Sequence, residues 1–307
     1  MNINALRYFA MVATSASFVT TARHFGVPAS SVSRYIAALE AEVGQQLLFR
    51  HTRAVRLTDA GERFYATIRE ALDLLDMAAE QAADKDAAPK GLVRVNAPLA
   101  LGRLHIAPIL HALQKVYPAL SVHLSLTDAF VDPVQEGADI TVRVGHLDDS
   151  RLVGRAIGTQ RYLLCASQDY LDAHGVPVHP GDLAAHNCLV YRGTMGAQRW
   201  YFRKPGHARY EAFAVRGTFE SNNAESLMSA AEASLGLVLF PTWLFTPASF
   251  ASGRLVKVLP EWEGSVEAEP PGIHLLSPEN RSRSRKVRVL TDFLIEHIGT
   301  PPYWDQV

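Results

Sequence analysis

The chain has 307 residues, of which 48% are hydrophobic and 20% charged, and its formal net charge is −1 at pH 7. This composition is typical of a globular protein of about two domains, and it argues against disordered, collagen-like and uniformly basic chains. The apolar run near the N-terminus, residues 8–13, is too short for a signal peptide or a membrane-spanning helix. We therefore expect a cytoplasmic protein with no membrane partner.

Charge is distributed unevenly along the first third of the chain. Residues 1–57 contain six arginines and two acidic residues, whereas residues 58–88 contain three basic and eight acidic residues. A basic segment followed by an acidic one favours contact with phosphate groups at one end only.

Residues 17–44 predict two short helices joined by a tight turn. Ser17 is a good N-cap, Gly26 suits a left-handed C-cap, and Pro28 suits the first turn of the second helix. The second helix has an apolar stripe at steps of four, three and four, made of Val32, Ile36, Leu39 and Val43. Its outward face carries Ser30, Ser33, Arg34 and Ala37. The pattern predicts a helix-turn-helix, with an ordinary helical hairpin as the alternative.

The segment that follows carries Arg50, Arg53 and Arg56 on a predicted β-ribbon, and a new helix begins near Thr58. Here the chain resembles the LysR-type transcriptional regulators. The resemblance rests on Ala22, Gly26, Val32, Ser33, Arg34, Ile36, Leu39, Glu40, Gly44, Leu47, Phe49, Arg50, Leu57, Thr58 and Gly61. It implies a winged helix-turn-helix DNA-binding domain at 1–58, a linker and dimerisation helix at 59–90, and an effector-binding domain at 91–307.

Carried over by position, the resemblance assigns contacts with double-stranded promoter DNA to Ala29, Ser30, Ser33 and Arg34, and to Arg50 and Arg53 on the wing. An arginine fork can bind guanine O6 and N7 together or clamp a phosphate. The alternative for Arg34 is a surface salt bridge to Glu40 or Glu42. The short side chains of Ala29 and Ser30 depart from the family pattern, so base readout rests on fewer contacts.

A helix from Thr58 to about Ala87 is predicted by the absence of proline and by a heptad pattern. Apolar residues step by four and three through Phe64, Ile68, Ala71, Leu75, Ala78 and Ala82. We expect Phe64, Ile68, Ala71 and Leu75 to pair two subunits, and the alternative is packing on the same chain. The resemblance further implies a dimer of dimers.

Residues 84–91 are a polar linker, after which strands and helices alternate. Alternation predicts two α/β lobes with mostly parallel sheets. The resemblance implies lobes like those of periplasmic solute-binding proteins, with lobe I at about 91–160 and 268–300 and lobe II at about 161–267.

An effector site is predicted where the strands of the two lobes end, because ligands of such sheets bind outside the carboxyl ends of strands. Two helix N-termini should face this cleft and attract an anion, so we expect a small organic acid. The candidate residues are Pro98, Leu99, Ala100, Thr127, Asp128, Phe130, Arg143, Ser221, Asn222, Asn223 and Phe240. Simple helix capping is an equally good interpretation of residues 221–223.

No motif for catalysis, nucleotide binding or metal binding is present, and we expect neither an enzyme nor a cofactor or metal. Cys165 and Cys188 are expected to be free thiols, with a redox pair as the less favoured reading. The basic run Arg281, Arg283, Arg285, Lys286 and Arg288 predicts a solvated face rather than a second nucleic-acid patch.

The resulting hypothesis is a transcriptional regulator that binds an interrupted dyad as a dimer or dimer of dimers, with RNA polymerase as a further partner. The effector would shift the placement of the DNA-binding heads. Two alternatives remain: a DNA-bending protein without an effector, and an enzyme or solute-binding module fused to a DNA-binding head.

Overall fold

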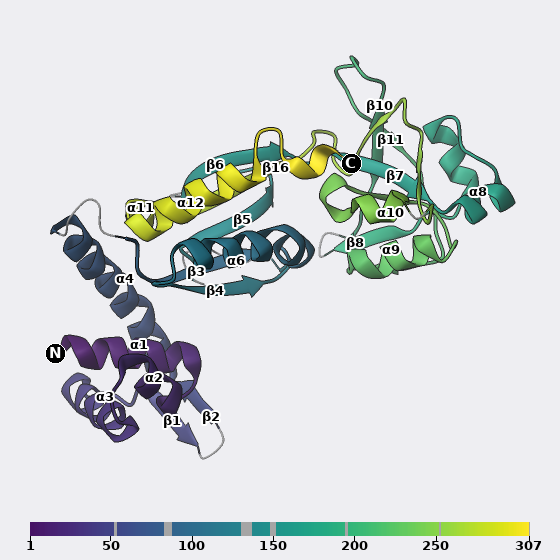
Figure 1. The fold of residues 1–307 in the computed structure, drawn as a ribbon. Helices are drawn as coiled ribbons and strands as arrows, with labels where there is room; N and C mark the ends of the chain where they lie inside the picture. The colour runs from purple at the N-terminus through teal and green to yellow at the C-terminus, as the bar shows by residue number, and fades with distance from the viewer. Residues whose placement is uncertain are drawn as a thin grey trace. The chain divides into compact units, whose positions relative to one another are not determined.

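The computed structural model describes residues 1–51, 54–82, 88–129, 137–147, 152–193, 196–251 and 253–306. The chain divides into two compact units, residues 1–87 with 283–285 and residues 88–282 with 286–307 (Figure 1). Among the described residues, no helix is long and apolar enough to cross a membrane.

The N-terminal unit begins with three helices, α1 (Ile3–Ser15), α2 (Phe18–Phe25) and α3 (Ala29–Val43). The Ser17 side chain caps α2 by accepting from the Thr20 N–H at 3.1 Å. Gly26 ends α2 at φ 64°, a left-handed conformation that glycine adopts without steric cost. Pro28 is the N-cap of α3 and lies just before its first turn, one position earlier than the sequence predicts.

The core of this unit joins the three helices to a two-stranded wing and to the long helix α4 (Asp59–Ala82). The wing pairs β1 (Leu48–His51) with β2 (Ala54–Leu57) in antiparallel register. Phe9, Val32 and Ile36 are fully buried in the core. The predicted apolar stripe of α3 therefore faces inward.

Lobe I of the C-terminal unit is a five-stranded sheet in the order β4-β3-β5-β16-β6. Its strands are β3 (Gly91–Ala97), β4 (Leu120–Leu126), β5 (Ile140–Gly145), β6 (Leu152–Thr159) and β16 (Gly272–Pro278). Strand β3 is parallel to β4 and β5, and β16 is antiparallel to β5 and β6. One continuous helix follows β3, made of α5 (Leu99–Leu101), the π-helical turn Gly102–Ile106 and α6 (Ala107–Val116).

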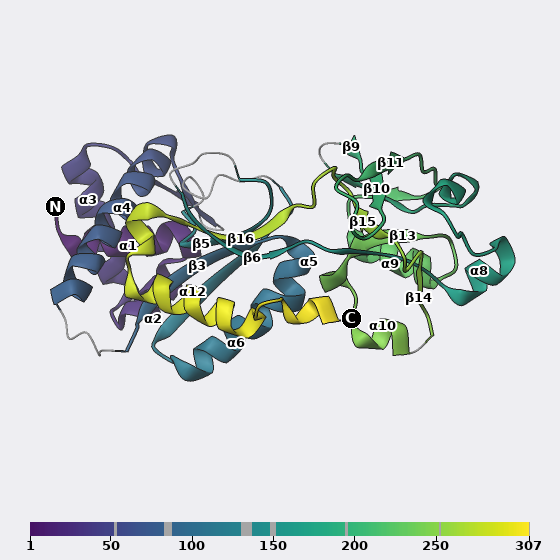
Figure 2. The same ribbon diagram turned by 90° about the horizontal axis from the view of Figure 1, so that it is seen from above.

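The C-terminal helices return to lobe I as α11 (Glu279–Ser282) and α12 (Arg285–Ile298), and a final 3-10 turn covers Tyr303–Gln306. Helices α6 and α12 lie along the same side of the sheet (Figure 2). Both contribute to one apolar core with strands β3 and β5.

Lobe II contains the sheet β11-β10-β15-β7-β13, with β14 also pairing with β7, and a smaller sheet β12-β8-β9. Its strands are β7 (Tyr162–Ala166), β8 (Val190–Gly193), β9 (Gly196–Ala197), β10 (Trp200–Arg203), β11 (Glu211–Phe213), β12 (Glu220–Ser221), β13 (Val238–Pro241), β14 (Val256–Val258) and β15 (Glu263–Ser265). Its helices are α8 (Gln168–His174), α9 (Ala224–Glu232) and α10 (Pro247–Ala251), with 3-10 turns at Pro180–Ala185 and Thr242–Leu244.

The expectation of mostly parallel sheets is wrong for lobe II. Every pairing in its larger sheet is antiparallel. Among the described residues of this lobe, parallel pairing is confined to β8 with β12 and to the bridges Asn187–Arg216 and Cys188–Leu237. The chain crosses between the lobes twice, through Gln160 and through the segment before Gly272, and the Gln160 N–H donates to the Pro271 carbonyl at 2.8 Å.

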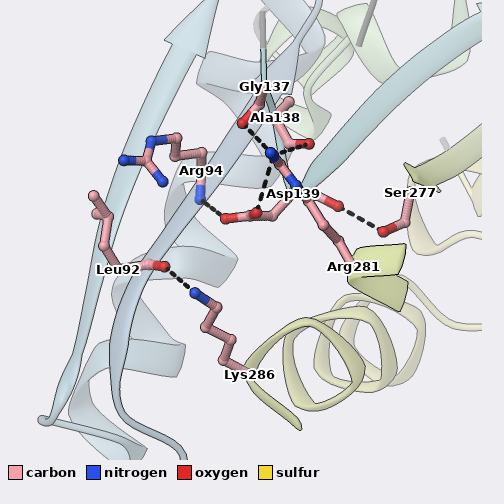
Figure 3. A network of polar contacts seen from close by, with 8 residues as sticks. All are labelled: Leu92, Arg94, Gly137, Ala138, Asp139, Ser277, Arg281 and Lys286. Carbon is pink, nitrogen blue, oxygen red and sulfur yellow. Dashed lines mark hydrogen bonds and ion pairs between the residues drawn. The ribbon is translucent and has the colours of Figure 1, made fainter. Parts of the chain in front are cut away.

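A buried ion pair anchors the C-terminal helices to the sheet of lobe I (Figure 3). Arg281 Nη1 lies 3.3 Å from Asp139 Oδ1 and donates to the carbonyls of Gly137 at 2.6 Å and Ala138 at 3.1 Å. Asp139 Oδ2 accepts from the Arg94 N–H at 2.8 Å. The solvated-face reading of the basic run is therefore wrong for Arg281, which is 6% exposed.

Lys286, from the same basic run, also contacts the sheet. Its Nζ donates to the Leu92 carbonyl at 2.9 Å, near the start of β3. This bond and the Arg281 pair hold α11 and α12 against the first strand that follows the linker.

Candidate functional site

Helix α3 presents the predicted DNA-reading face with two exposed side chains, Ser30 and Arg34. Ala29 and Ser33 are half-buried, and Ala29 packs against the core of the unit. Among the described residues, no ion pair involves Arg34. The two carboxylates considered as its partners are engaged elsewhere.

Glu42 forms an ion pair with the N-terminal amino group at 2.6 Å. Glu40 Oε1 accepts from the N–H groups of Leu47 at 2.9 Å and Leu48 at 3.1 Å. A carboxylate that accepts two backbone N–H bonds is a strong anchor. Glu40 thus fixes the base of the wing to α3, a role that the salt-bridge alternative did not anticipate.

The wing base is also fixed to α4. The Thr58 N–H donates to the Leu47 carbonyl at 3.0 Å, and a Cβ on Gly61 would lie 2.0 Å from the same oxygen. Only glycine allows so close an approach. The side chain of Arg50 and all of Arg53 lie outside the described residues, so their predicted wing contacts stay predictions.

Helix α4 buries some of its apolar residues in the N-terminal unit and leaves others exposed. Phe64 and Ile68 pack in the core of the N-terminal unit, and Ile68 is 6% exposed, so the seam predicted through them is wrong. Leu72 joins them in this core. Helix α1 lies against α4 and is tied to it by an ion pair between Arg7 and Asp76. The exposed apolar face of α4 instead consists of Ala71, Leu74, Leu75 and Ala78, of which Leu74 was not predicted.

The C-terminal unit contains a cavity of about 410 Å³ between its two lobes. Eight of the predicted effector residues line it: Pro98, Leu99, Ala100, Thr127, Asp128, Arg143, Asn223 and Phe240. Ser221 and Asn222 do not line it, and Phe130 lies outside the described residues. Sequence reasoning missed several polar lining residues, namely Asn96, Thr141, Gln160, Tyr162, Tyr191, Gln198 and Glu225.

Two helix starts border the cavity, and each already uses one backbone donor. Asp128 Oδ1 accepts from the Leu99 N–H at 2.9 Å. Asn223 Oδ1 accepts from the Ser226 N–H at 2.8 Å, so the capping interpretation of residues 221–223 is correct for Asn223. The helix ends therefore offer fewer donors to an anion than the sequence predicts.

A buried polar network lies where the chain crosses between the lobes. Trp243 Nε1 donates to Gln160 Oε1 at 3.1 Å, and Gln160 Nε2 donates to the Tyr162 hydroxyl. Burial raises the pKa of Tyr162, so the phenol stays protonated at neutral pH. All three side chains line the cavity, and they are fixed by one another.

His105 adds a second polar contact between the lobes. Its Nε2 lies 2.7 Å from the Trp243 carbonyl, which can only accept, so this nitrogen carries the proton. Nδ1 then accepts from the Tyr303 hydroxyl at 2.6 Å. Burial lowers the pKa of His105 more than the bond to Trp243 raises it, which favours the neutral imidazole.

The rim of the cavity is bridged by charged and polar side chains. Arg103 of lobe I forms an ion pair with Glu225 at the start of α9 in lobe II. Tyr191 of lobe II has a raised pKa, chiefly from burial and in part from the negative charge of Asp128 in lobe I. The two lobes are therefore coupled electrostatically across the site.

Cys165 and Cys188 are free and fully buried, and they belong to different core clusters. Burial raises the pKa of both thiols, that of Cys188 to about 12. Such thiols are poor nucleophiles. The redox-pair alternative is therefore not supported.

Comparison with known proteins identifies both parts of the chain. Residues 3–62 match the family described as "Bacterial regulatory helix-turn-helix protein, lysR family", and residues 86–299 match "LysR substrate binding domain". The chain is 32% identical over 302 residues to the probable HTH-type transcriptional regulator LtrA of Klebsiella pneumoniae, covering 97% of this chain and 96% of that protein. It is 33% identical over 300 residues to the HTH-type transcriptional regulator DmlR of Escherichia coli (strain K12), covering 97% and 94%.

Solved structures agree with this assignment. The full-length structure of AphB, a virulence activator of Vibrio cholerae and a member of the same family, covers 96% of this chain and 99% of its own. The two chains are 30% identical, with a TM-score of 0.58. An N-terminal helix-turn-helix domain, a two-lobed substrate-binding domain and relatives that span nearly the whole length lead to one conclusion: the chain belongs to the LysR family of transcriptional regulators.

Proposed function

We propose that this regulator binds promoter DNA as a dimer and that a small organic molecule with a carboxylate, bound between the two lobes, changes that binding. The cavity of the C-terminal unit carries the proposal, because its volume of about 410 Å³ lies in the range of small-molecule sites. It combines apolar walls with an arginine and several amides. The protein would act in the cytoplasm, and it would not be an enzyme.

DNA recognition is proposed for the exposed face of α3, with Ser30 and Arg34 in the major groove and the wing beside it. Arg34 is exposed at the second turn of a helix whose opposite face is fully buried. A helix held in this way can insert its outer face into the groove as a rigid body. Wing contacts from Arg50 and Arg53 belong to the same proposal.

Dimerisation is proposed along the exposed face of α4. Leu74 is 50% and Leu75 is 49% exposed, and with Ala71 and Ala78 they recur at the spacing of one helix face. Adjacent exposed leucines favour a helix partner over solvent. Assembly of two such dimers and contact with RNA polymerase stay predictions.

Of the two alternatives, a DNA-bending protein without an effector would have no use for a polar cavity between its lobes. The cavity therefore favours effector binding over DNA bending alone. An enzyme fused to a DNA-binding head is disfavoured because the ionisable lining groups form caps and ion pairs. Asp128 caps a helix and Glu225 pairs with Arg103, so neither is arranged as a general acid or base beside a nucleophile.

The test is a titration of promoter DNA with the full-length protein, with and without a panel of organic acids and neutral metabolites. We expect at least one acid to shift both the melting temperature and the footprint on the DNA. Absence of any ligand across a broad panel would contradict the effector proposal and leave the DNA-bending alternative.

A further inference from the structure

The charges that line the cavity define the kind of effector more closely than its size does. Of the described lining residues, three carry a formal charge: Asp128, Arg143 and Glu225. Glu225 forms an ion pair with Arg103, whose positive charge offsets that of the carboxylate. The lining therefore adds one carboxylate and one guanidinium to its uncharged polar groups, which is a poor match for a dianion.

The positive side of the cavity is the carboxyl end of the sheet in lobe I. Thr141 and Arg143 are two residues apart on β5, so their side chains lie on the same side of the sheet. Asn96 of β3 is paired in register with Thr141 and also lines the cavity. These three side chains form one continuous polar patch of amide, hydroxyl and guanidinium donors.

The hydroxyl of Thr141 is the group in this patch that lacks a hydrogen-bond partner among the described residues. The residue is 7% exposed. Burying a hydroxyl without a partner costs free energy, which a ligand oxygen would recover. A carboxylate beside Thr141 and Arg143 supplies acceptors for both groups.

The negative side is the loop after β4, where Asp128 lies. One carboxylate oxygen of Asp128 is held by the Leu99 N–H, which orients the side chain at the cavity wall. Its charge reaches Tyr191 on the opposite lobe, since it contributes to the raised pKa of that phenol. A second carboxylate on the ligand would be repelled here, whereas a protonated amine would be attracted.

We infer that the effector is a net-neutral zwitterion, of the class of amino acids, with its carboxylate at Asn96, Thr141 and Arg143 and its ammonium group at Asp128. The inference rests on the proposed function, because it names the ligand class of the same cavity. Dicarboxylates and simple acids carry no ammonium group, so they would bind the polar patch of Asn96, Thr141 and Arg143 but make no ion pair with Asp128.

The experiment is calorimetry and thermal shift on the full-length protein with compounds matched in carbon skeleton. The panel contains the proteinogenic amino acids in both enantiomers and two matched sets: leucine, isocaproate and isoamylamine, and phenylalanine, hydrocinnamate and phenethylamine. Succinate and glutarate represent the dicarboxylates. We expect binding by at least one amino acid and weaker binding by its amine-free and carboxylate-free analogues.

Two variants and a matched control separate the two sides of the site. Asp128→Asn keeps an oxygen for the Leu99 N–H but removes the charge, so affinity for the amino acid should fall on the order of tenfold or more while that for the amine-free acid should not fall. Thr141→Val should weaken the binding of every ligand that carries a carboxylate. It should also raise the melting temperature of the unliganded protein. Glu211→Gln on β11, which is exposed and does not line the cavity, is the matched control.

Tighter binding of a dicarboxylate than of any amino acid, or an Asp128→Asn variant that binds the amino acid as wild type does, overturns the inference and leaves the proposed function intact. Binding by no member of the panel overturns the inference as well. In that case the broader titration of promoter DNA decides whether the proposed function also fails.

Discussion

The two units hold their functional side chains in opposite ways. In the N-terminal unit Arg34 stands exposed on a helix whose inner face is fully buried, and no ion pair with a described residue restrains it. In the C-terminal unit three side chains at the cavity are bonded to one another, in a chain from Trp243 through Gln160 to Tyr162. Changing an exposed contact should alter binding alone, whereas changing a networked group should alter stability as well.

The largest effect is expected for the buried ion pair of lobe I. Arg281→Ala leaves Asp139, which is 2% exposed, without its cation, and such a loss costs about 3–5 kcal/mol of unfolding free energy. Chemical denaturation of the full-length protein measures it. The control is Arg155→Ala, whose pair with Asp292 is 57% and 68% exposed and should contribute only about 0–1 kcal/mol. Equal losses for the two variants would contradict the contrast between buried and exposed pairs.

The next effect concerns the buried and the exposed apolar residues of α4. Leu74→Glu with Leu75→Glu places charges in the proposed dimer interface and should split dimers while each subunit stays folded, at a cost of roughly 2–5 kcal/mol in association. Sedimentation reports the assembly and circular dichroism the fold. Ile68→Glu should instead unfold the N-terminal unit, because Ile68 lies in its core. If the doubly substituted protein remains a dimer, the exposed residues of α4 do not form the dimer interface.

Arg34→Ala tests the expectation that an exposed side chain affects DNA binding without affecting stability. It should weaken specific DNA binding by about 1–3 kcal/mol and relax discrimination at one base pair. The free energy of unfolding should change by no more than about 0.5 kcal/mol, because the side chain makes no ion pair within the described part of the chain. Fluorescence titration at fixed salt measures the first quantity, with Arg63→Ala on α4 as the control. If Arg34→Ala binds specific DNA with the affinity of the wild-type protein, Arg34 does not contact the DNA.

The smallest effect is a dependence of stability on pH. The folded protein lowers the pKa of His105, so the unfolded chain binds more protons and stability falls as the pH drops below the ordinary value of about 6.5. His186 and His274 are shifted in the same direction. His105→Gln should therefore reduce, and not abolish, the loss of melting temperature between pH 7.5 and 5.5. The exposed His123→Gln is the control, and an unchanged pH dependence in His105→Gln would contradict the assignment.

The sequence predicts the N-terminal unit better than the C-terminal one for a physical reason. Helix caps and a stripe such as Val32, Ile36 and Leu39 are local signals, and the structure places them as expected. The heptad of α4 failed as a single seam because its residues meet different surroundings along the helix. An α-helix drifts only about 20° per heptad, so Ile68 and Leu75 point in nearly the same direction. Ile68 packs in the core of the N-terminal unit, whereas Leu75, two turns further on, is 49% exposed.

The site in the C-terminal unit was only partly predictable. The segments at strand ends could be named from the rule for parallel strands, and six residues found this way line the cavity, whereas Arg143 was named from the resemblance and Phe240 as an apolar wall. Thr141 and Asn96 could not be predicted as lining residues. Buried residues inside a strand have the sequence pattern of core residues until the position of the facing lobe is known. Strand β6 was missed because Gly154 and Gly158 weaken its pattern. A Cβ on Gly158 would lie 2.7 Å from Pro302, so the C-terminal segment requires this glycine.

The ion pair between Arg103 and Glu225 has a consequence for how salt acts on this regulator. Its side chains are 53% and 41% exposed, so dissolved ions screen their attraction. A rise in ionic strength therefore weakens the ion pair that links the lobes, and at the same time it weakens phosphate contacts on DNA. The slope of DNA affinity against salt concentration should then differ with and without the effector, and that difference measures how strongly the lobes communicate with the DNA-binding heads.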